Sequence, residues 1–390
     1  MVSQLLSPTE IDHPPLTGQG THETAPPSRR VLILTAEIGA GHTSTARALK
    51  RHLECEDELA QVDLAEPIND VPSFARLPHV YRFVTAYMPI IWAAFYYSRK
   101  LKMVRRLYGK FIRRRLRLAI TQLRVEEYDT VVITYSMYCN CIDSFRQAGA
   151  RTVVLVTDLF GGPHEWFASG ADQYIVPTKQ MVDMAEACKI DPERILLRRL
   201  PTLASDVEPR VTWNAHTALR ILVIGGSEGL GPLRAAANGI LRGRRNASVT
   251  VVCGNNQRLK RRLRRSAAFA EGYVEEVATT YQNYDLVVTK PGSVTVMELL
   301  HQNVPFVLLP GIPGIEAGNT RLLQRTRTPR IRSLREASLV TRHLVNHDLS
   351  LSCDGIQWLD ILSKLRDSLP VDCVSIEEIA PVYRATKLRA

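Results

Sequence analysis

Short apolar runs alternate along this chain with glycine-containing turns and with segments whose apolar residues have helical spacing. In the first example, the run VLILTA (31–36) leads through a turn at 37–44 into an amphipathic segment at 45–54. Because parallel strands need a crossover between them, usually a helix, this order predicts an α/β fold with a parallel sheet. Further apolar runs that fit the same sheet follow at 131–136, 151–158 and 171–178.

The same order starts again at 220–226, where RILVIGG leads into a glycine-rich turn and a helical segment at 233–243. Two such units predict two Rossmann-like domains with a cleft between them, and ligands of such sheets bind beyond the carboxyl ends of the strands. We expect a disordered tail, a first domain, a second domain and a C-terminal segment of helices and tail, at residues 1–28, 29–205, 206–345 and 346–390.

Two strand-to-helix turns follow one another within 286–319. The apolar run at 286–289 meets a Pro-Gly-Ser turn, in which Ser293 is expected to cap the next helix. After a second short apolar run, Glu316 and Asn319 lie at the start of another helix. Helix N-termini bind phosphates, and Glu and Asn side chains can bind hydroxyls. The combination favours a sugar nucleotide over a bare phosphate.

Residues 71–125 contain no Asp or Glu. The run FVTAYMPIIWAAFYY (83–97) is uncharged, and ten Lys or Arg residues follow it between 99 and 117. The run is too short to span a bilayer, and Pro89 at its middle disfavours a single helix. It can be a membrane-docking surface with a polybasic helix over anionic lipids, or a buried helical hairpin with a solvated basic face. The absence of acids beside so many cations favours docking.

Composition adds expectations about partners and location. The chain has 390 residues, a net charge of +11 and seven cysteines without a repeating spacing. Free thiols fit a reducing cytoplasm, no secretory signal pattern is visible, and the cysteine spacing predicts no metal site. The excess positive charge calls for an anionic partner such as a nucleotide or a membrane. The basic helix predicted at 258–265 lacks interleaved aromatics, so we expect no nucleic acid partner.

Two candidate catalytic residues follow strands of the first domain. His42 comes after the glycine turn 39–41, where it can accept a proton from an attacking hydroxyl or merely cap the turn. Ser44 replaces the third glycine of the G-x-G-x-x-G motif, which argues against a nicotinamide cofactor. Asp158 ends another strand and can orient a partner or cap a loop. The loop after it adds two side chains that can contact an acceptor or pack over the domain edge, His164 and Trp166.

Residues 225–229 match G-x-S-x-G, the nucleophile turn of α/β-hydrolases. That interpretation makes Ser227 a nucleophile and requires a histidine, for which His301 or His343 is available. His301, however, lies inside a predicted helix. A glycine-rich anion-binding turn explains the same residues without a catalytic triad, and we prefer it.

Several motifs resemble one glycosyltransferase family. The most specific are VIGGSEGLGP, VVCGNNQRL, LVVTKPGSVTVMELL and PGIPGIEAGN, at 223–232, 251–259, 286–300 and 310–319. Together with looser matches at 34–49 and 156–166, they resemble the monogalactosyldiacylglycerol synthase and processive diacylglycerol glucosyltransferase family. The resemblance implies a GT-B fold of the family 28 type and inverting transfer of a hexose from a UDP-sugar to a lipid, above all diacylglycerol. It also implies a cytoplasmic protein peripherally bound to an anionic membrane surface through 83–117.

The resemblance also implies roles position by position. His42 would be the general base, and Asp158 would handle the acceptor. The diphosphate, uracil, ribose and sugar would be held by donor-binding residues from the second domain, Gly226, Ser227, Tyr273, Val274, Pro291, Gly292, Ser293, Glu298, Glu316 and Asn319. Membrane or acceptor contact would come from the first domain, through Phe83, Tyr87, Trp92, Phe95, Arg113, Arg114, Arg115, His164 and Trp166.

One position departs from the family pattern. The family has Gln where this chain has Ile315, and Ile cannot hydrogen-bond a sugar hydroxyl, so the donor sugar is left open. No D-x-D metal signature is present, and we expect no cofactor besides the UDP-sugar substrate. Two other classes remain: a UDP-sugar epimerase or hydrolase of the same fold, and a non-catalytic lipid- or nucleotide-binding homologue.

Overall fold

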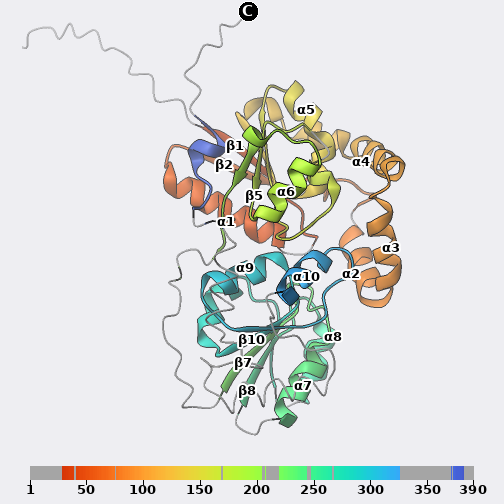
Figure 1. Cartoon of the computed structure of the whole chain (residues 1–390), viewed down its shortest axis with the longest axis vertical. Coiled ribbons are helices and arrows are strands. Elements are labelled where there is room, and N and C mark those ends of the chain that lie inside the picture. The colour runs from red at the N-terminus through yellow and green to blue at the C-terminus, as the bar shows by residue number, and fades with distance from the viewer. Residues whose placement is uncertain are drawn as a thin grey trace, which may run out of the picture.

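The computed structural model describes most of the chain, namely residues 29–38, 41–74, 76–167, 170–203, 207, 219–243, 247–265, 268–325, 370 and 372–381. The predicted tail at 1–28, two residues of the first glycine turn (Gly39 and Ala40), and the helices expected within 346–390 other than at 372–381 lie outside the described residues. Figure 1 shows two α/β units, one above the other, with the N-terminal unit on top.

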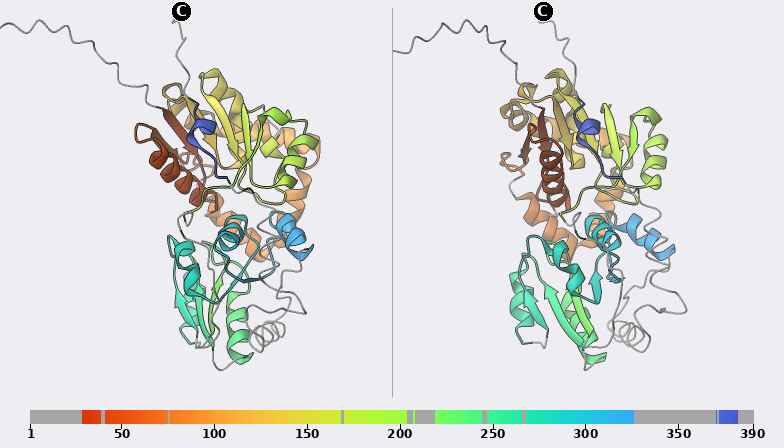
Figure 2. Two further views of the ribbon diagram at one scale, coloured as in Figure 1. Left: turned by 60° about the vertical axis from the view of Figure 1, so that its left-hand side comes forward. Right: turned by 90° about the vertical axis from the view of Figure 1, so that its left-hand side faces the viewer.

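The first unit is built on a parallel six-stranded sheet with the order β2-β1-β3-β4-β5-β6. All residues of β3 are buried, as expected for aliphatic strands covered on both faces, and Figure 2 shows helices on either side of the sheet. The strands are β1 (Arg30–Leu34), β2 (Gln61–Ala65), β3 (Thr130–Ile133), β4 (Arg151–Leu155), β5 (Gln173–Val176) and β6 (Ile195–Leu197). The helices are α1 (Gly41–Glu56), α2 (Leu77–Tyr87), α3 (Pro89–Ser98), α4 (Lys102–Gln122), α5 (Ile142–Gln147) and α6 (Lys179–Ala187), with short 3-10 turns η1 (Val125–Glu127), η2 (Ser136–Cys141), η3 (His164–Phe167) and η4 (Pro192–Arg194).

The second unit is built on a parallel five-stranded sheet with the order β11-β10-β7-β8-β9. Its strands are β7 (Leu219–Ile224), β8 (Ala247–Val252), β9 (Phe269–Glu271), β10 (Leu286–Thr289) and β11 (Phe306–Leu308). Its helices are α7 (Leu233–Gly243), α8 (Gln257–Leu263), α9 (Ser293–His301) and α10 (Ala317–Arg325), with the 3-10 turn η5 (Val277–Asn283). The predicted α/β class with two Rossmann-like sheets is therefore confirmed. The expected helix cap is wrong by one residue, because Gly292 is the N-cap of α9 and Ser293 is its first residue.

The uncharged run at 83–97 is divided between two helices. Pro89 is the first residue of α3, a position where the missing N–H costs nothing, so the chain turns at Met88 instead of forming one helix. The turn is exposed: Tyr87, Ile90 and Ile91 have 66%, 82% and 59% of their surface accessible. The hairpin is therefore not buried, although α4 after it packs one apolar face into the core and leaves its basic face in solvent.

A segment near the C-terminus returns to the first unit, which the sequence did not predict. The Arg199 N–H donates to the Asp372 carbonyl at 2.8 Å, and a short helix α13 (Ile376–Ile379) follows, with Ile379 fully buried. His52 of α1 contacts the Val374 carbonyl at 2.8 Å through Nε2. In Figure 2 this segment, in blue, lies against the N-terminal sheet. The chain thus crosses between the two sheets twice.

The two units touch where β4 ends. The Phe160 N–H donates to Oδ1 of Asn319 at 3.2 Å, and the Leu159 N–H donates to Oγ of Ser293 at 3.3 Å. At Gly318, an added Cβ would lie 1.9 Å from the Phe160 carbonyl oxygen, so a side chain there is incompatible with this approach. These contacts set the loops of the first sheet against the first turns of α9 and α10.

Candidate active site

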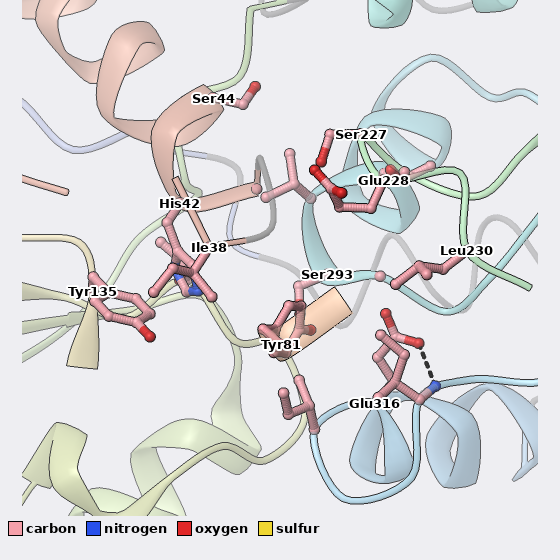
Figure 3. Close-up of a pocket in the computed structure, with 18 of the residues that line it drawn as sticks. Ile38, His42, Ser44, Tyr81, Tyr135, Ser227, Glu228, Leu230, Ser293 and Glu316 are labelled. Atoms are coloured by element: carbon pink, nitrogen blue, oxygen red, sulfur yellow. Dashed lines mark hydrogen bonds between the residues drawn. The ribbon is translucent and has the colours of Figure 1, made fainter. Parts of the chain in front are cut away.

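A cavity of about 440 Å³ lies between the carboxyl ends of the two sheets. Its walls come from the residues after β1, β3 and β4 in the first unit and after β7, β10 and β11 in the second. Ligand sites of α/β sheets occur at these strand ends, and the volume is in the range of small-molecule pockets. Figure 3 shows side chains of both units pointing into this space.

His42 enters the cavity wall from the first turn of α1. Its Nδ1 lies 2.9 Å from the Thr134 carbonyl oxygen and 2.7 Å from the Thr157 hydroxyl oxygen. A carbonyl oxygen can only accept, so Nδ1 carries the proton and Nε2 keeps a free lone pair. Burial lowers the pKa of His42 from 6.5 to about 4, against the smaller opposite effect of the Thr134 bond. The ring is therefore neutral near pH 7, which is the state that a general base needs.

Asp158 follows β4 and lies in the same cavity. The indole Nε1 of Trp166 donates to its Oδ2 at 2.7 Å. Burial raises the pKa of Asp158 to about 6, partly offset by this bond. Trp166 is fully buried and does not line the cavity, so its expected contact with an acceptor is wrong: it positions Asp158. His164 also lies outside the cavity lining, with Nδ1 3.7 Å from Sγ of Cys188.

The turn after β7 is closed by its own backbone. The Leu230 N–H donates to the Gly225 carbonyl at 3.1 Å, and Gly226 has a positive φ of 73°. Ser227 lines the cavity, but His301 lies outside the lining and contacts Arg199 at 2.9 Å, while His343 is not among the described residues. The described residues therefore do not assemble the hydrolase triad, and the turn remains an anion-binding candidate.

Lys290 is a site residue that the sequence analysis missed. A Cβ added at Gly226 would lie 3.2 Å from its Cε, and one added at Gly292 would lie 3.3 Å from its Nζ. The ammonium therefore sits beside both glycine turns that are expected to hold the diphosphate. It also forms an ion pair with Glu316, whose Oε2 accepts the Ile312 N–H at 2.7 Å. The signal was in the sequence, since a lysine directly precedes the Pro-Gly-Ser turn.

Asn319 and Ser293 bond to each other and to backbone. Nδ2 of Asn319 donates to the Pro291 carbonyl at 2.8 Å and to Oγ of Ser293 at 3.0 Å. Both amide hydrogens and one lone pair of Asn319 are thus used at the junction between the units. Both residues line the cavity, so contact with a donor stays a prediction.

Glu298 is the most strongly shifted carboxyl in the second unit. It projects from α9 and is 4% exposed, and the Tyr281 hydroxyl donates to its Oε2 at 3.3 Å. Burial raises the pKa of Glu298 from 4.5 to about 8, against the smaller effect of the Tyr281 bond. Tyr273 and Val274, expected beside a uracil, line the same end of the cavity, and Ile315 lines it as an apolar residue.

The first-unit end of the cavity is an aromatic chamber formed by α2, α3 and α4. Trp92 and Phe95 line it, as expected for an acceptor, whereas Phe83 and Tyr87 lie outside the lining and are exposed. Nε1 of Trp92 is buried without a hydrogen-bond partner among the described residues. The remaining aromatic and aliphatic lining is Phe74, Leu77, Val80, Tyr81, Val84, Tyr96, Tyr108 and Phe111.

Comparisons with known proteins show what the two units are similar to. The model of the monogalactosyldiacylglycerol (MGDG) synthase family matches residues 42–201, and that of the glycosyltransferase family 28 C-terminal domain matches 220–313. A processive diacylglycerol beta-glucosyltransferase of Bacillus cereus (strain G9842) is 26% identical over 317 residues, covering 76% of this chain and 80% of the relative. The chain is thus similar to the MGDG synthases and processive diacylglycerol glucosyltransferases over most of both units. The chloroplastic MGDG synthase of Spinacia oleracea is 24% identical over 323 residues, covering 75% of this chain and 61% of the relative.

Solved structures of similar fold have the GT-B architecture. A spinosyn rhamnosyltransferase, SpnG, has a TM-score of 0.56 at 13% identity and covers 87% of this chain and 95% of its own. The MurG protein of Acinetobacter baumannii has a TM-score of 0.50 at 15% identity, covering 88% and 96%. At these identities the likeness concerns the fold alone. The predicted GT-B architecture is confirmed.

Replacing Glu298 tests the cost of its burial. Folding raises the pKa of this carboxyl, so the folded chain holds a proton that the unfolded chain releases, and its contribution to stability falls as pH rises from about 4.5 to about 8. We expect Glu298→Gln to raise the free energy of unfolding at pH 8 by about 1–2 kcal/mol while weakening UDP binding about tenfold. Thermal unfolding at several pH values, with UDP titration by calorimetry, measures both effects. A Tm difference that does not change with pH would contradict this account.

Proposed function

We propose that this protein transfers a hexose from a UDP-sugar to the hydroxyl of a lipid, with diacylglycerol as the acceptor and inversion at the anomeric carbon. One observation carries the proposal: the same cavity has glycine turns and a helix N-terminus at one end and aromatic walls at the other. His42, which is neutral near pH 7, lies in the wall of this cavity. The names of the two relatives given above describe one as a diacylglycerol glucosyltransferase and the other as a synthase of monogalactosyldiacylglycerol. Both names support diacylglycerol as the acceptor.

The donor end suits a nucleoside diphosphate. The N-terminus of α9 and the closed turn at Gly226 offer backbone N–H groups, and Lys290 adds a positive charge between them. These groups would stabilise the negative charge that develops on UDP as the bond to the sugar breaks. Among the described residues no cluster of three His, Cys, Asp or Glu side chains could hold a metal ion. The proposal rests on the neutral backbone N–H donors and on the Lys290 ammonium, which is paired with Glu316.

The acceptor end supplies the base. The acceptor hydroxyl would lie against Nε2 of His42, which takes the proton as the hydroxyl oxygen forms its bond to the anomeric carbon and UDP departs. The Thr134 carbonyl holds the ring in the required tautomer and accepts a stronger bond once the imidazole is charged. The unpartnered indole N–H of Trp92 can donate to an ester carbonyl of the lipid, and the aromatic walls exclude water.

We propose peripheral binding to an anionic membrane through the turn between α2 and α3, with the basic face of α4 beside it. Arg113, Arg114 and Arg115 are exposed on α4, and the aliphatic residues of the turn are exposed next to the aromatic chamber. No helix among the described residues is long and apolar enough to cross a bilayer. A lipid acceptor could then pass from the bilayer into the cavity without crossing water.

The transfer assay tests the reaction itself. Protein is incubated with liposomes containing diacylglycerol and with UDP-[14C]glucose or UDP-[14C]galactose, and lipid-soluble label is counted. We expect label in the lipid fraction with at least one donor. Turnover without liposomes would support an epimerase or hydrolase instead, and UDP binding without any turnover would support the non-catalytic alternative.

Removing the base should stop transfer while leaving donor binding intact. We expect His42→Ala to lower kcat at least about 100-fold, because the attacking hydroxyl then loses its proton acceptor. Thr157→Val serves as the matched control, since it removes the second contact of Nδ1 and leaves the Thr134 bond in place; we expect it to lower kcat less than about tenfold. A near-normal rate for His42→Ala with unchanged UDP affinity would return this histidine to a structural role.

Polar residues at the exposed turn should release the protein from membranes. We expect Ile90→Ser/Ile91→Ser to reduce flotation with liposomes about tenfold or more, because burial of two isoleucines in the acyl region is lost. Leu59→Ser/Leu118→Ser provides a control of similar exposure, 56% and 77%, at positions outside both the turn and the cavity lining. Equal flotation of the Ile90/Ile91 variant and the native protein would argue against docking through this turn.

A further inference from the structure

A second hollow of about 550 Å³ lies in the second unit, next to the active-site cavity: Gly231 and Asn256 in its lining follow Leu230 and Gly254 of the cavity wall closely in the chain. It is a groove between α7 and α8, and its rim includes Tyr87 from the end of α2. Small residues at its floor, Gly231, Ala235 and Gly239, leave the space open. In Figure 1, α7 and α8 lie below α2 and α3 on the same side of the molecule, which agrees with this contact.

Four arginines line this groove, and no acidic residue among those described lines it. Arg234 and Arg242 are eight positions apart on α7, and Arg258 and Arg262 are four apart on α8, so each pair lies on one helical face. All four are exposed at the surface. Arg258 and Arg262, four positions apart, repel each other slightly, and an anion bound between them would offset that repulsion.

The arginines come from two helices, so a phosphate group in the groove can be held from two sides. Guanidinium groups bind phosphate oxygens in pairs of parallel hydrogen bonds, which a point charge such as Lys cannot do. Asn256 also lines the groove, but its amide is used within the protein: Oδ1 accepts the Leu259 N–H at 2.9 Å and Nδ2 donates to the Gly229 carbonyl at 3.3 Å.

The surroundings distinguish a membrane phospholipid from other anions. Tyr87 belongs both to the rim of the groove and to the exposed turn between α2 and α3, where Met88, Ile90 and Ile91 have 43%, 82% and 59% of their surface accessible. At a bilayer these residues would enter the acyl region while the arginines meet the phosphates just above it. A nucleic acid would neutralise the arginines but leave the aliphatic residues in water.

We propose that the α7–α8 groove is a headgroup site for an anionic phospholipid, distinct from both the donor and the acceptor sites. Because Tyr87 comes from the first unit and the arginines from the second, a bound lipid touches both units at once. The second unit is thereby held at the membrane surface beside the turn that inserts. This inference rests on the proposed action at a lipid surface, but it does not require catalysis.

The test compares binding to phosphatidylcholine vesicles with and without about one-fifth phosphatidylglycerol, in the absence of donor and acceptor. We expect Arg258→Gln/Arg262→Gln to weaken binding to the anionic vesicles about tenfold, and Arg234→Gln/Arg242→Gln to do the same from the other wall. The matched control is Arg261→Gln/Arg265→Gln, which removes the same charge from the same region at positions outside the groove, and we expect a loss below about threefold.

Equal losses in the groove variants and the control would overturn the proposal in favour of diffuse attraction, and so would unchanged binding of both groove variants. Tighter binding of the native protein to duplex RNA than to anionic vesicles, lost in the groove variants, would overturn it in favour of a nucleic acid site. Thermal unfolding checks that each variant is folded. A failure of glycolipid synthesis would contradict the proposed function. It would not affect the headgroup site, which the binding measurement tests without donor or acceptor.

Discussion

The contact between the loop after β4 and the first turns of α9 and α10 determines the geometry of the whole site. Two hydrogen bonds, from Leu159 to Ser293 and from Phe160 to Asn319, join backbone of one unit to side chains of the other. Gly318 permits the approach, because any side chain there would collide with the Phe160 carbonyl. Asp158 immediately precedes this contact, so the acceptor-side carboxyl is held in register with the donor-side helix N-termini.

The charges inside the cleft follow from how each group is buried. Glu316 is paired with Lys290, and Asp158 is held by an indole N–H, but Glu298 has only the Tyr281 hydroxyl. Its raised pKa keeps it protonated near neutral pH in the empty protein. A negatively charged diphosphate entering the cleft therefore meets less repulsion than a count of acidic side chains would suggest. His42 is neutral for a related reason, since its burial disfavours the charged ring.

Much of the fold was readable because apolar runs buried on both faces leave a strong pattern. Every strand predicted from such a run is present, and the positions of His42 and Asp158 after strand ends followed from it. Side-chain partners were not readable, because they depend on which loops meet across the cleft. Trp166 looked available to an acceptor, yet it is buried against Asp158, and Asn319 turned out to be bonded at the junction.

Two further features escaped prediction for different reasons. Lys290 was overlooked because a lone lysine beside a turn looks like ordinary surface charge, and only the folded chain brings it between two glycine turns. The return of residues 372–381 to the first sheet was missed because the segment is short: its regular structure is one isolated bridge and one four-residue helix. Its burial depends on a surface made by α1 and β6, far away in the sequence.

This return also limits how the cleft can open. A protein whose two lobes share one covalent connection can twist, slide or separate about that single point. Here the polypeptide passes from the first lobe to the second and back again, and the returning end is fastened by Ile379 in the core and by the ion pair between Arg198 and Glu378 at 2.6 Å. The second lobe is therefore tied to the first at both of its ends, so neither end of it can part from the first lobe without the other connection still holding.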